Sequence, residues 1–325
     1  EWVINKKRVV VIGAAGQIGT PLTKSLLKLG HDVKAVVRRI DNSSELKLKL
    51  FESLGATVTV ETETENEEVM TEVMRGYDTV VVCTPANEYT VTVVEPILLQ
   101  AALNAGVKRF VPDEFGCHTR NIEVGEGILF DYKKALHEKI IDSGIGYTFF
   151  YNGGIFDYFL PNLRFFEKVT TFGKMDLPIH THDIEDIGYI AALSITDERT
   201  VNKCVQMDYN VLTQTKMLDL VKEFYPKEKL AYTHYSEEYI IRMKDEASNE
   251  VTAKAGKETD RERWGINNVI YVLGKLASFS DGTLRTSELF PHVMIKKPEE
   301  AISNRDFFFD KWCTNEILVI ILLFK

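Results

Sequence analysis

A strand-like hydrophobic run that leads into three evenly spaced glycines is the strongest constraint on the fold of this chain. Residues 9–20 read VVVIGAAGQIGT, with glycines at positions 13, 16 and 19. The first glycine permits a tight turn, the second lets the backbone approach a pyrophosphate, and the third lets a helix pack closely on the strand. The pattern predicts a dinucleotide site, and the alternative is a turn that serves only the fold. The expected cofactor-binding residues are Gly13, Ala15, Gly16, Gln17, Ile18 and Gly19.

The first 150 residues alternate strand-like and helix-like segments, which is typical of a parallel sheet with helical crossovers. The expected strands are Arg8–Gly13, Asp32–Val37, Thr57–Glu61, Thr79–Thr84, Arg109–Val111 and Tyr147–Tyr151. The expected helices are Gln17–Leu29, Ser44–Leu54, Glu67–Arg75, Val91–Ala105 and Tyr132–Ser143, each followed by a glycine. Glycine adopts the left-handed conformation that ends a helix without strain. The predicted fold class is therefore α/β, with a Rossmann-like doubly wound parallel sheet.

The alternation loosens after about residue 155, where we expect helices at Leu212–Phe224 and Glu237–Lys244. The charged stretch Lys254–Arg263 is either a loop or a solvated helix. We expect an NADP-binding Rossmann domain over residues 5–157, completed by parts of 182–210, and a smaller C-terminal α/β substrate-binding lobe over 158–310.

Residues 311–325 form an apolar tail that contains the run Ile317–Phe324. This run is too short to cross a bilayer, which takes about 20 residues. We expect the tail to pack on the core or on a partner, and the alternative is a peripheral anchor or interface.

The end of the second strand sets the choice of cofactor. An acidic residue there binds the ribose of NAD, whereas arginine accommodates the 2′-phosphate of NADP. This chain has Arg38 and Arg39 at that place, so the sequence favours NADPH. The alternative is a solvated basic pair. Thr84 follows the fourth strand, where topology places the backbone beside the nicotinamide ribose.

Composition excludes several kinds of partner and site. The chain has 39 basic and 48 acidic residues, a net charge of −9, and no basic cluster, so nucleic acid is not an expected partner. Its four cysteines lie far apart without C-x-x-C spacing, which argues against a metal site or a disulfide framework and favours a reducing compartment. Lys6 and Lys7 lead directly into a strand pattern rather than a secretory segment, so we expect a cytoplasmic protein.

Several motifs together resemble the isoflavone-reductase-like branch of the NmrA-like atypical short-chain dehydrogenases. This branch includes phenylcoumaran benzylic ether, pinoresinol–lariciresinol and eugenol-forming reductases. The similar segments are GAAGQIG at 13–19, KRFVPDEFG at 108–116, GIGYT at 144–148 with Asn152, DIEDIG at 183–188, DERTVNK at 197–203 and LFPHV at 289–293. The resemblance covers most of residues 8–305.

The resemblance implies an NADPH-dependent reductase in which a lysine on the helix after the PDEFG segment assists proton transfer. The family pattern places that lysine at Lys133, which would also contact the cofactor, and adds Asn152 to the cofactor-binding residues. Three positions depart from the pattern. Asp113 stands where family members have serine, and His137-Glu138 replaces a pair of arginines.

Helical phase selects the same lysine. At roughly 100° per residue, Lys133 falls in the apolar stripe with Leu136 and Ile140, whereas Lys134 lies at its border and Lys139 points away. An ammonium held toward a partly dry cleft becomes a useful acid or base. The alternative is a lysine whose long stem extends to water.

The predicted function is hydride transfer from NADPH to a small aromatic or conjugated substrate, with Lys133 as general acid/base. Tyr151, Phe156 and Tyr158 are candidate walls of the substrate pocket, although such aromatic residues often belong to the core. The alternative is an NADP(H)-binding redox sensor or structural protein without turnover. A homodimer is one further expectation.

Overall fold

The computed structural model describes residues 6–39, 42–249 and 259–310. Within them, the main sheet has eight parallel strands in the order β13-β10-β6-β5-β4-β1-β2-β3. These strands are β1 (Arg8–Ile12), β2 (Asp32–Val37), β3 (Thr57–Val60), β4 (Thr79–Val82), β5 (Arg109–Val111), β6 (Gly146–Tyr151), β10 (Lys203–Gln206) and β13 (Leu284–Arg285). The doubly wound parallel sheet is confirmed, and it extends beyond the six expected strands by β10 and β13.

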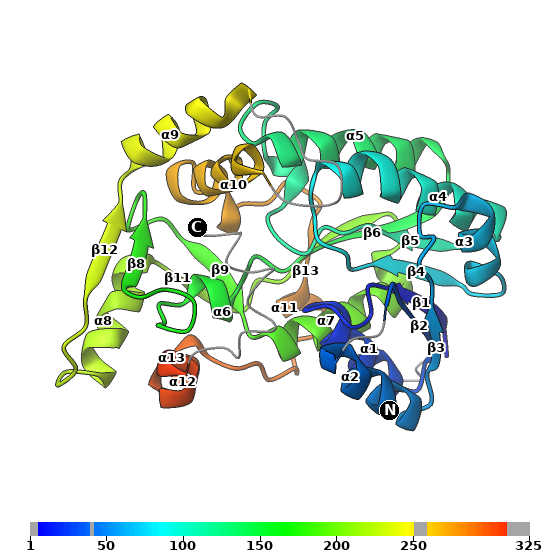
Figure 1. The fold of residues 1–325 in the computed structure, drawn as a ribbon, viewed down its shortest axis with the longest axis horizontal. Coiled ribbons are helices and arrows are strands. Elements are labelled where there is room, and N and C mark those ends of the chain that lie inside the picture. The colour runs from blue at the N-terminus through cyan, green and yellow to red at the C-terminus, as the bar shows by residue number, and fades with distance from the viewer. Residues whose placement is uncertain (1–5, 40–41, 250–258, 311–325) are drawn as a thin grey trace.

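Among the described residues, six helices cover this sheet, and all but α7, which was not predicted, begin and end within a few residues of their predicted bounds. They are α1 (Gly19–Lys28), α2 (Asn42–Ser53), α3 (Glu67–Met74), α4 (Glu95–Asn104), α5 (Ile128–Asp142) and α7 (Ile184–Thr196). Gly30, Gly55, Gly76, Gly106 and Gly144 follow five of them, all with φ between 74° and 95°. Helices α1, α2 and α7 cover one face and α3, α4 and α5 the other (Figure 1).

The predicted helix Val91–Ala105 is wrong in one respect, because it divides into a π-helical turn η1 (Thr90–Val94) and α4. Pro96 lies at the start of α4 and has no N–H to donate to the preceding turn. The backbone N–H of Glu95 donates instead to Thr90, five residues back.

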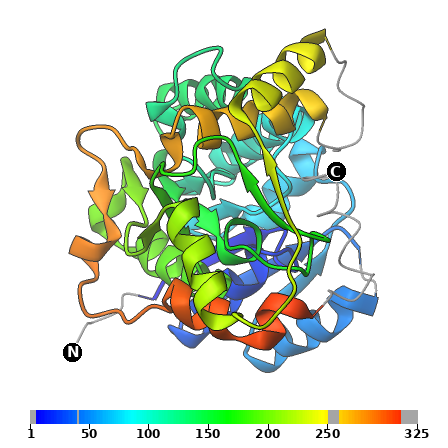
Figure 2. The ribbon, with the colours of Figure 1, turned by 90° about the vertical axis from the view of Figure 1, so that its left-hand side faces the viewer.

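Most of the remaining elements form a second lobe beside the main sheet. They include β7 (Gly154–Ile155), β9 (Ile179–His182) and β11 (Val211–Leu212) in one small sheet, and β8 (Val169–Phe172) with β12 (Tyr232–Tyr235) in another. The helices are α6 (Phe156–Phe159), α8 (Gln214–Phe224), α9 (Glu237–Glu246), α10 (Asp260–Asn267), α11 (Thr286–Leu289), α12 (Pro298–Ser303) and α13 (Arg305–Phe309). Single turns are η2 (Thr119–Asn121), η3 (Glu198–Thr200), η4 (Ala247–Asn249), η5 (Asn268–Val272) and η6 (Lys275–Ala277). Figure 2 shows β8, β12 and α8 crossing in front of the main sheet.

Helix α10 ties the second lobe to the main sheet. It occupies the end of the charged stretch, but it is not a fully solvated helix, because Glu262 and Arg263 are buried. Glu262 accepts a hydrogen bond of 2.5 Å from the backbone N–H of Glu88, just before η1. Gly265 also lies against Gly127 at the start of α5. The second lobe therefore supports the helix that carries Lys133.

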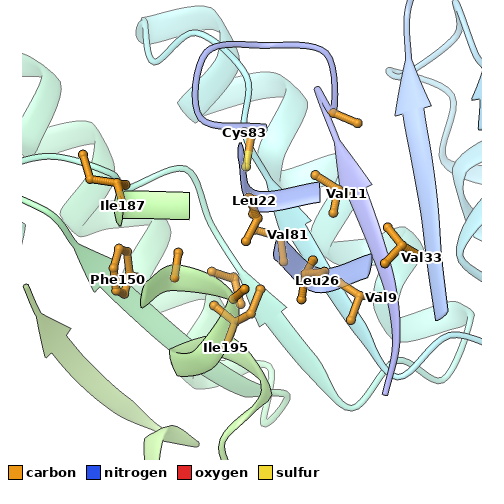
Figure 3. Packing of buried hydrophobic residues seen from close by; sticks show 14 of the residues in the cluster. Val9, Val11, Leu22, Leu26, Val33, Val81, Cys83, Phe150, Ile187 and Ile195 are labelled. Atoms are coloured by element: carbon orange, nitrogen blue, oxygen red, sulfur yellow. The ribbon is translucent and has the colours of Figure 1, made fainter. Parts of the chain in front are cut away.

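The core packs on both faces of the main sheet. On one face Val9, Val11 and Val81 meet Leu22 and Leu26 of α1 (Figure 3). Ile187 and Ile195 of α7 join the same cluster. This packing fixes where α1 begins, and hence the position of the glycine loop ahead of it.

Two expectations concern the apolar tail and the absence of a membrane-spanning segment. The apolar tail 311–325 lies outside the described residues. In the part of the chain that is described, no helix is both long enough and apolar enough to span a membrane.

Candidate functional site

The glycine loop is so tightly packed that two of its glycines have no room for a side chain. Gly13 has φ +81°, and a Cβ there would lie 2.3 Å from the carbonyl oxygen of Cys83. A Cβ on Gly19 would lie 2.1 Å from the carbonyl oxygen of Gly13. Gly16 is exposed, between partly buried Ala15 and Gln17. The loop thus follows β1 and packs against the carboxyl end of β4. These two strands flank the point where the strand order reverses.

Basic residues lie beside this loop. Arg38 and Arg39 follow β2, the strand next to β1, and both are exposed. Lys47 of α2 donates a hydrogen bond of 3.2 Å to the carbonyl of Ala15. Sequence reasoning missed Lys47, because nothing in helical spacing shows that α2 packs against the loop.

Thr84 and Asn152 follow β4 and β6 at the same edge of the sheet. The hydroxyl oxygen of Thr84 and the amide oxygen of Asn152 are buried, and neither has a hydrogen-bond partner among the described residues. Buried polar atoms are usually paired, so two unpaired ones at one sheet edge indicate a place for a ligand. Both residues are among the predicted cofactor-binding positions.

A buried histidine supports Asn152 from behind. The Nδ1–H of His182 donates to the carbonyl of Asn152 at 2.8 Å, and its Nε2 accepts from the backbone N–H of Asn210 at 3.3 Å. Only the neutral ring can make both bonds, since a protonated ring has no acceptor. Burial lowers the pKa of His182 to about 3, so the neutral ring persists to acid pH.

We expect His182 to make the fold acid-sensitive. The unfolded chain takes up a proton on this residue below about pH 6.5, whereas the folded protein does not, so stability falls as pH drops from about 6.5 toward 3. Each unit of pH removes about 1.4 kcal/mol per such group. His182→Gln should be less stable at pH 7.5 but lose about 2 to 3 kcal/mol less than wild type between pH 6.5 and 4.5. Urea unfolding over this range measures it, and the exposed His292→Gln should keep the wild-type slope. Equal slopes for wild type and His182→Gln would contradict the role.

Lys133 lies in the buried stripe of α5, as helical phase predicted. Its side chain is 4% exposed, whereas Lys134 is half-buried and Lys139 exposed. The Nζ donates to the carbonyl oxygens of Asp113 at 2.6 Å and Glu114 at 3.1 Å. The lysine therefore does not extend to water, but is held at the carboxyl end of β5.

Glu114 is a buried carboxylate with both oxygens paired. One accepts from Nε2 of His137 at 2.8 Å, and the other from the hydroxyl of Thr119. Burial alone would raise the pKa of Glu114, but Lys133, His137 and Thr119 outweigh it and hold that pKa below its usual range. His137, which departs from the family pattern, also stacks on Phe149 at 3.8 Å between ring centroids. Together these contacts fix the segment whose carbonyls hold Lys133.

Asp113 differs from Glu114, because its Oδ2 is buried and has no hydrogen-bond partner among the described residues. Its backbone N–H donates to Oε2 of Glu95 at 3.1 Å, which brings the two acidic residues together. Burial raises the pKa of Asp113 to about 7, although Lys133 opposes the shift. Burial, and then the charge of Asp113, raise the pKa of Glu95 well above its usual value.

The three candidate pocket residues occupy different environments. Tyr151 and Phe156 are fully buried in core clusters. Tyr158 is half-buried, and its hydroxyl donates to Oε1 of Gln17 in the glycine loop at 2.8 Å. Tyr158 also lines a small cavity in the second lobe, together with Phe159, Phe166, Phe172, Gln214 and Tyr271. The described residues contain no group of histidine, cysteine or acidic side chains that could hold a metal ion.

Comparison with known proteins agrees with the motifs. The chain is 29% identical over 317 residues to the isoflavone reductase homolog A622 of Nicotiana tabacum, covering 92% of this chain and 97% of that protein. It is 27% identical to the phenylcoumaran benzylic ether reductase IRL1 of Ginkgo biloba, covering 92% and 99%. A solved structure of AtPrR2 with NADP+ and (+)-pinoresinol superposes with a TM-score of 0.77 at 25% identity, covering 92% and 98%.

A model of the whole family gives the assignment. It matches residues 5–263, which include the glycine loop, the strand ends around Thr84, Asp113 and Asn152, and the helix of Lys133. The resemblance found in the sequence is thereby confirmed, and the chain belongs to the NmrA-like family.

Proposed function

We propose that this chain is an NADPH-dependent reductase of a small aromatic or conjugated substrate, with Lys133 as the general acid/base. One observation carries the proposal. A buried lysine is held at the carboxyl end of β5, on the sheet edge where the glycine loop and the unpaired polar atoms of Thr84 and Asn152 also lie. Ligands of doubly wound sheets bind at this edge, beside the point where strand order reverses.

The residues of the loop and its surroundings fit NADPH. Gly13, Ala15, Gly16, Gln17, Ile18 and Gly19 would hold the pyrophosphate, with the N-terminus of α1 directed at it. Arg38 and Arg39 would bind the 2′-phosphate, and Lys47 adds positive charge on the same side. Thr84 and Asn152 would offer their unpaired oxygens to the ribose and nicotinamide end. When bound, NADPH supplies the hydride.

Lys133 would handle the proton. An ammonium group has three N–H donors, and the carbonyls of Asp113 and Glu114 take two of them, which leaves one for a substrate oxygen. These two carbonyls fix the direction of the remaining donor. Glu114 stays ionised nearby and compensates the charge of the ammonium.

The aromatic cavity supports the choice of substrate class. Tyr158 belongs both to the cavity wall and, through Gln17, to the glycine loop. Phe172 and Tyr271 stack within the wall at 5.1 Å between ring centroids. The cavity has a volume of about 20 Å³, so it would have to widen to admit a substrate, and its aromatic rings would then stack on a flat, conjugated ligand. Phe156 shares a buried cluster with Phe172 and Tyr271 and would support the cavity wall, whereas Tyr151 belongs to the cluster on the main sheet and stays a predicted pocket residue.

Three further features belong to the proposal. The Rossmann domain would span 5–157 with parts of 182–210, and the substrate lobe would span 158–310. The strand β13 lies within the second range but pairs with β10 in the main sheet. A cytoplasmic location is supported by Cys83, Cys117 and Cys204, which are free thiols in the described chain. A homodimer remains a prediction.

The test is turnover. The protein is incubated with NADPH and a panel of phenylpropanoid ethers, enones and quinones, and oxidation of NADPH is followed by absorbance. We expect tight NADPH binding and substrate-dependent oxidation with at least one aromatic compound. Binding of NADPH without oxidation above background on any compound would contradict the reductase and favour a sensor or structural protein. A protein that does not bind NADPH would contradict both the reductase and the NADP(H)-binding sensor or structural protein.

A further inference from the structure

Asp113 and Glu95 are two buried acidic side chains, and each has one carboxyl oxygen without a hydrogen-bond partner in the described part of the chain. Glu95 is fully buried in α4 and Asp113 is 6% exposed after β5. In the described part of the chain, Oδ2 of Asp113 and Oε1 of Glu95 are both buried and have no hydrogen-bond partner. A buried carboxyl group without a partner costs free energy. Glu114, one residue away, shows that this fold can satisfy a buried carboxylate fully, so the unpaired oxygens indicate a missing ligand.

The acidic pair lies beside the glycine loop. The carbonyl oxygen of Cys83 occupies the space above Gly13, where a Cβ would meet it at 2.3 Å. The pKa of the Cys83 thiol is raised by its burial and then by the charges of Asp113 and Glu95, so all three groups are neighbours. Asp113 therefore lies at the carboxyl ends of β4 and β5, on the side of the switch point where a dinucleotide folds its reactive end against the sheet.

Hydride loss changes the charge of the nicotinamide ring from neutral in NADPH to positive in NADP+. We propose that Asp113, supported by Glu95, makes this site bind the cationic ring of NADP+ more tightly than the neutral ring of NADPH. The inference rests on the proposed binding of NADP(H) and adds a property to it. A site that prefers the oxidised ring makes bound NADPH a stronger hydride donor.

The charges around Asp113 do not cancel this effect. The neighbouring groups are Cys83 after β4, Glu95 on α4, Glu114 in the same loop and Lys133 on α5. The ammonium of Lys133 would disfavour a cationic ring, but ionised Glu114 compensates it. The thiol of Cys83 stays protonated at neutral pH, because burial and the two acids raise its pKa. The carboxylate of Asp113 is then the charge that the ring meets without compensation.

The preference should increase with pH. Asp113 loses its proton near pH 7, and only its ionised form attracts the cation. The ratio of dissociation constants, NADPH over NADP+, should therefore be low at pH 6 and rise as the carboxyl group ionises. The 2′-phosphate titrates identically in both cofactors and cancels from the ratio.

The experiment is calorimetric titration of the full chain with NADP+ and with NADPH at pH 6.0, 7.0, 8.0 and 8.5. For wild type we expect the ratio to rise about tenfold across this range, which corresponds to about 1.4 kcal/mol. In Asp113→Asn and Asp113→Ser the ratio should stay constant. Asp157→Asn, which alters a buried acid paired with Arg164 in the second lobe, should keep the wild-type rise.

A second variant distinguishes this role from a structural one. Glu95→Gln exchanges an acid whose raised pKa keeps it protonated at neutral pH for a neutral side chain of the same size, so the ratio should still rise over the wild-type pH range and stay high at pH 8.5. Thermal melts check folding, and Asp113→Asn should melt no lower than wild type, because it removes an unpaired carboxyl group. If both cofactors bind and the ratio is the same in wild type and Asp113→Asn, the inference fails while cofactor binding stands. If neither cofactor binds, the proposed function fails with it.

Discussion

Lys133→Met should lower kcat by about 10²- to 10⁴-fold with any substrate found for the protein, which is the usual effect of removing a general acid. The dissociation constant for NADPH should change by less than about fivefold, since the loop and the arginines remain. Methionine has a similar length and fills the stripe beside Leu136. The loss would therefore report the missing proton donor and not a cavity. Stopped-flow kinetics and cofactor titration measure the two quantities separately.

Two further lysine variants make this test specific. Lys133→Arg keeps the positive charge but cannot give up its proton at any working pH, so it should not restore kcat. Lys134→Met changes the neighbouring lysine at the border of the stripe and should leave kcat within about twofold. If Lys133→Met keeps more than half of the wild-type kcat, Lys133 is not the general acid. Full activity in Lys133→Arg would mean that the site needs only the charge.

The sequence predicted those parts of the fold that depend on local patterns. Gly13 and Gly19 could be recognised because a tight turn after a strand admits almost no other residue. The burial of Lys133 followed from helical periodicity, which needs no knowledge of tertiary contacts. The first six strands of the main sheet followed in the same way from alternating segments.

Contacts between distant segments could not be predicted in this way. Glu95 meets Asp113 across 18 positions, and His182 supports Asn152 across 30, with no spacing rule that joins either pair. The two residues of β13 carry no strand signal of their own, and they become a strand only because β10 offers an open edge. For the same reason, Asp113 was visible as a departure from a family pattern, whereas its pairing with Glu95 was not.

Gly188→Ala should destabilise the protein by about 2 kcal/mol and weaken NADPH binding with it. Gly188 lies in α7 within the DIEDIG segment, whose resemblance to family members carried no physical reason in the sequence. In the structure, a Cβ on Gly188 would lie 2.5 Å from both the carbonyl carbon and the Cβ of Pro21 in α1. Backbone atoms cannot move aside as a flexible side chain can, so the two helices must separate. The gain in helix propensity from alanine, about 1 kcal/mol, offsets only part of this cost.

NADPH binding should weaken because α1 begins at Gly19, the last glycine of the loop. Displacing α1 moves the N-terminus that would face the pyrophosphate. Gly265→Ala is the matched control, because Gly265 is also a helical glycine but its Cβ would approach no atom closer than 3.3 Å. It should change stability by less than about 1 kcal/mol and leave NADPH binding intact. Urea unfolding and cofactor titration of both variants measure the effect. Equal behaviour of the two variants would show that α1 and α7 tolerate a wider spacing, and that the DIEDIG glycine is not needed for their contact.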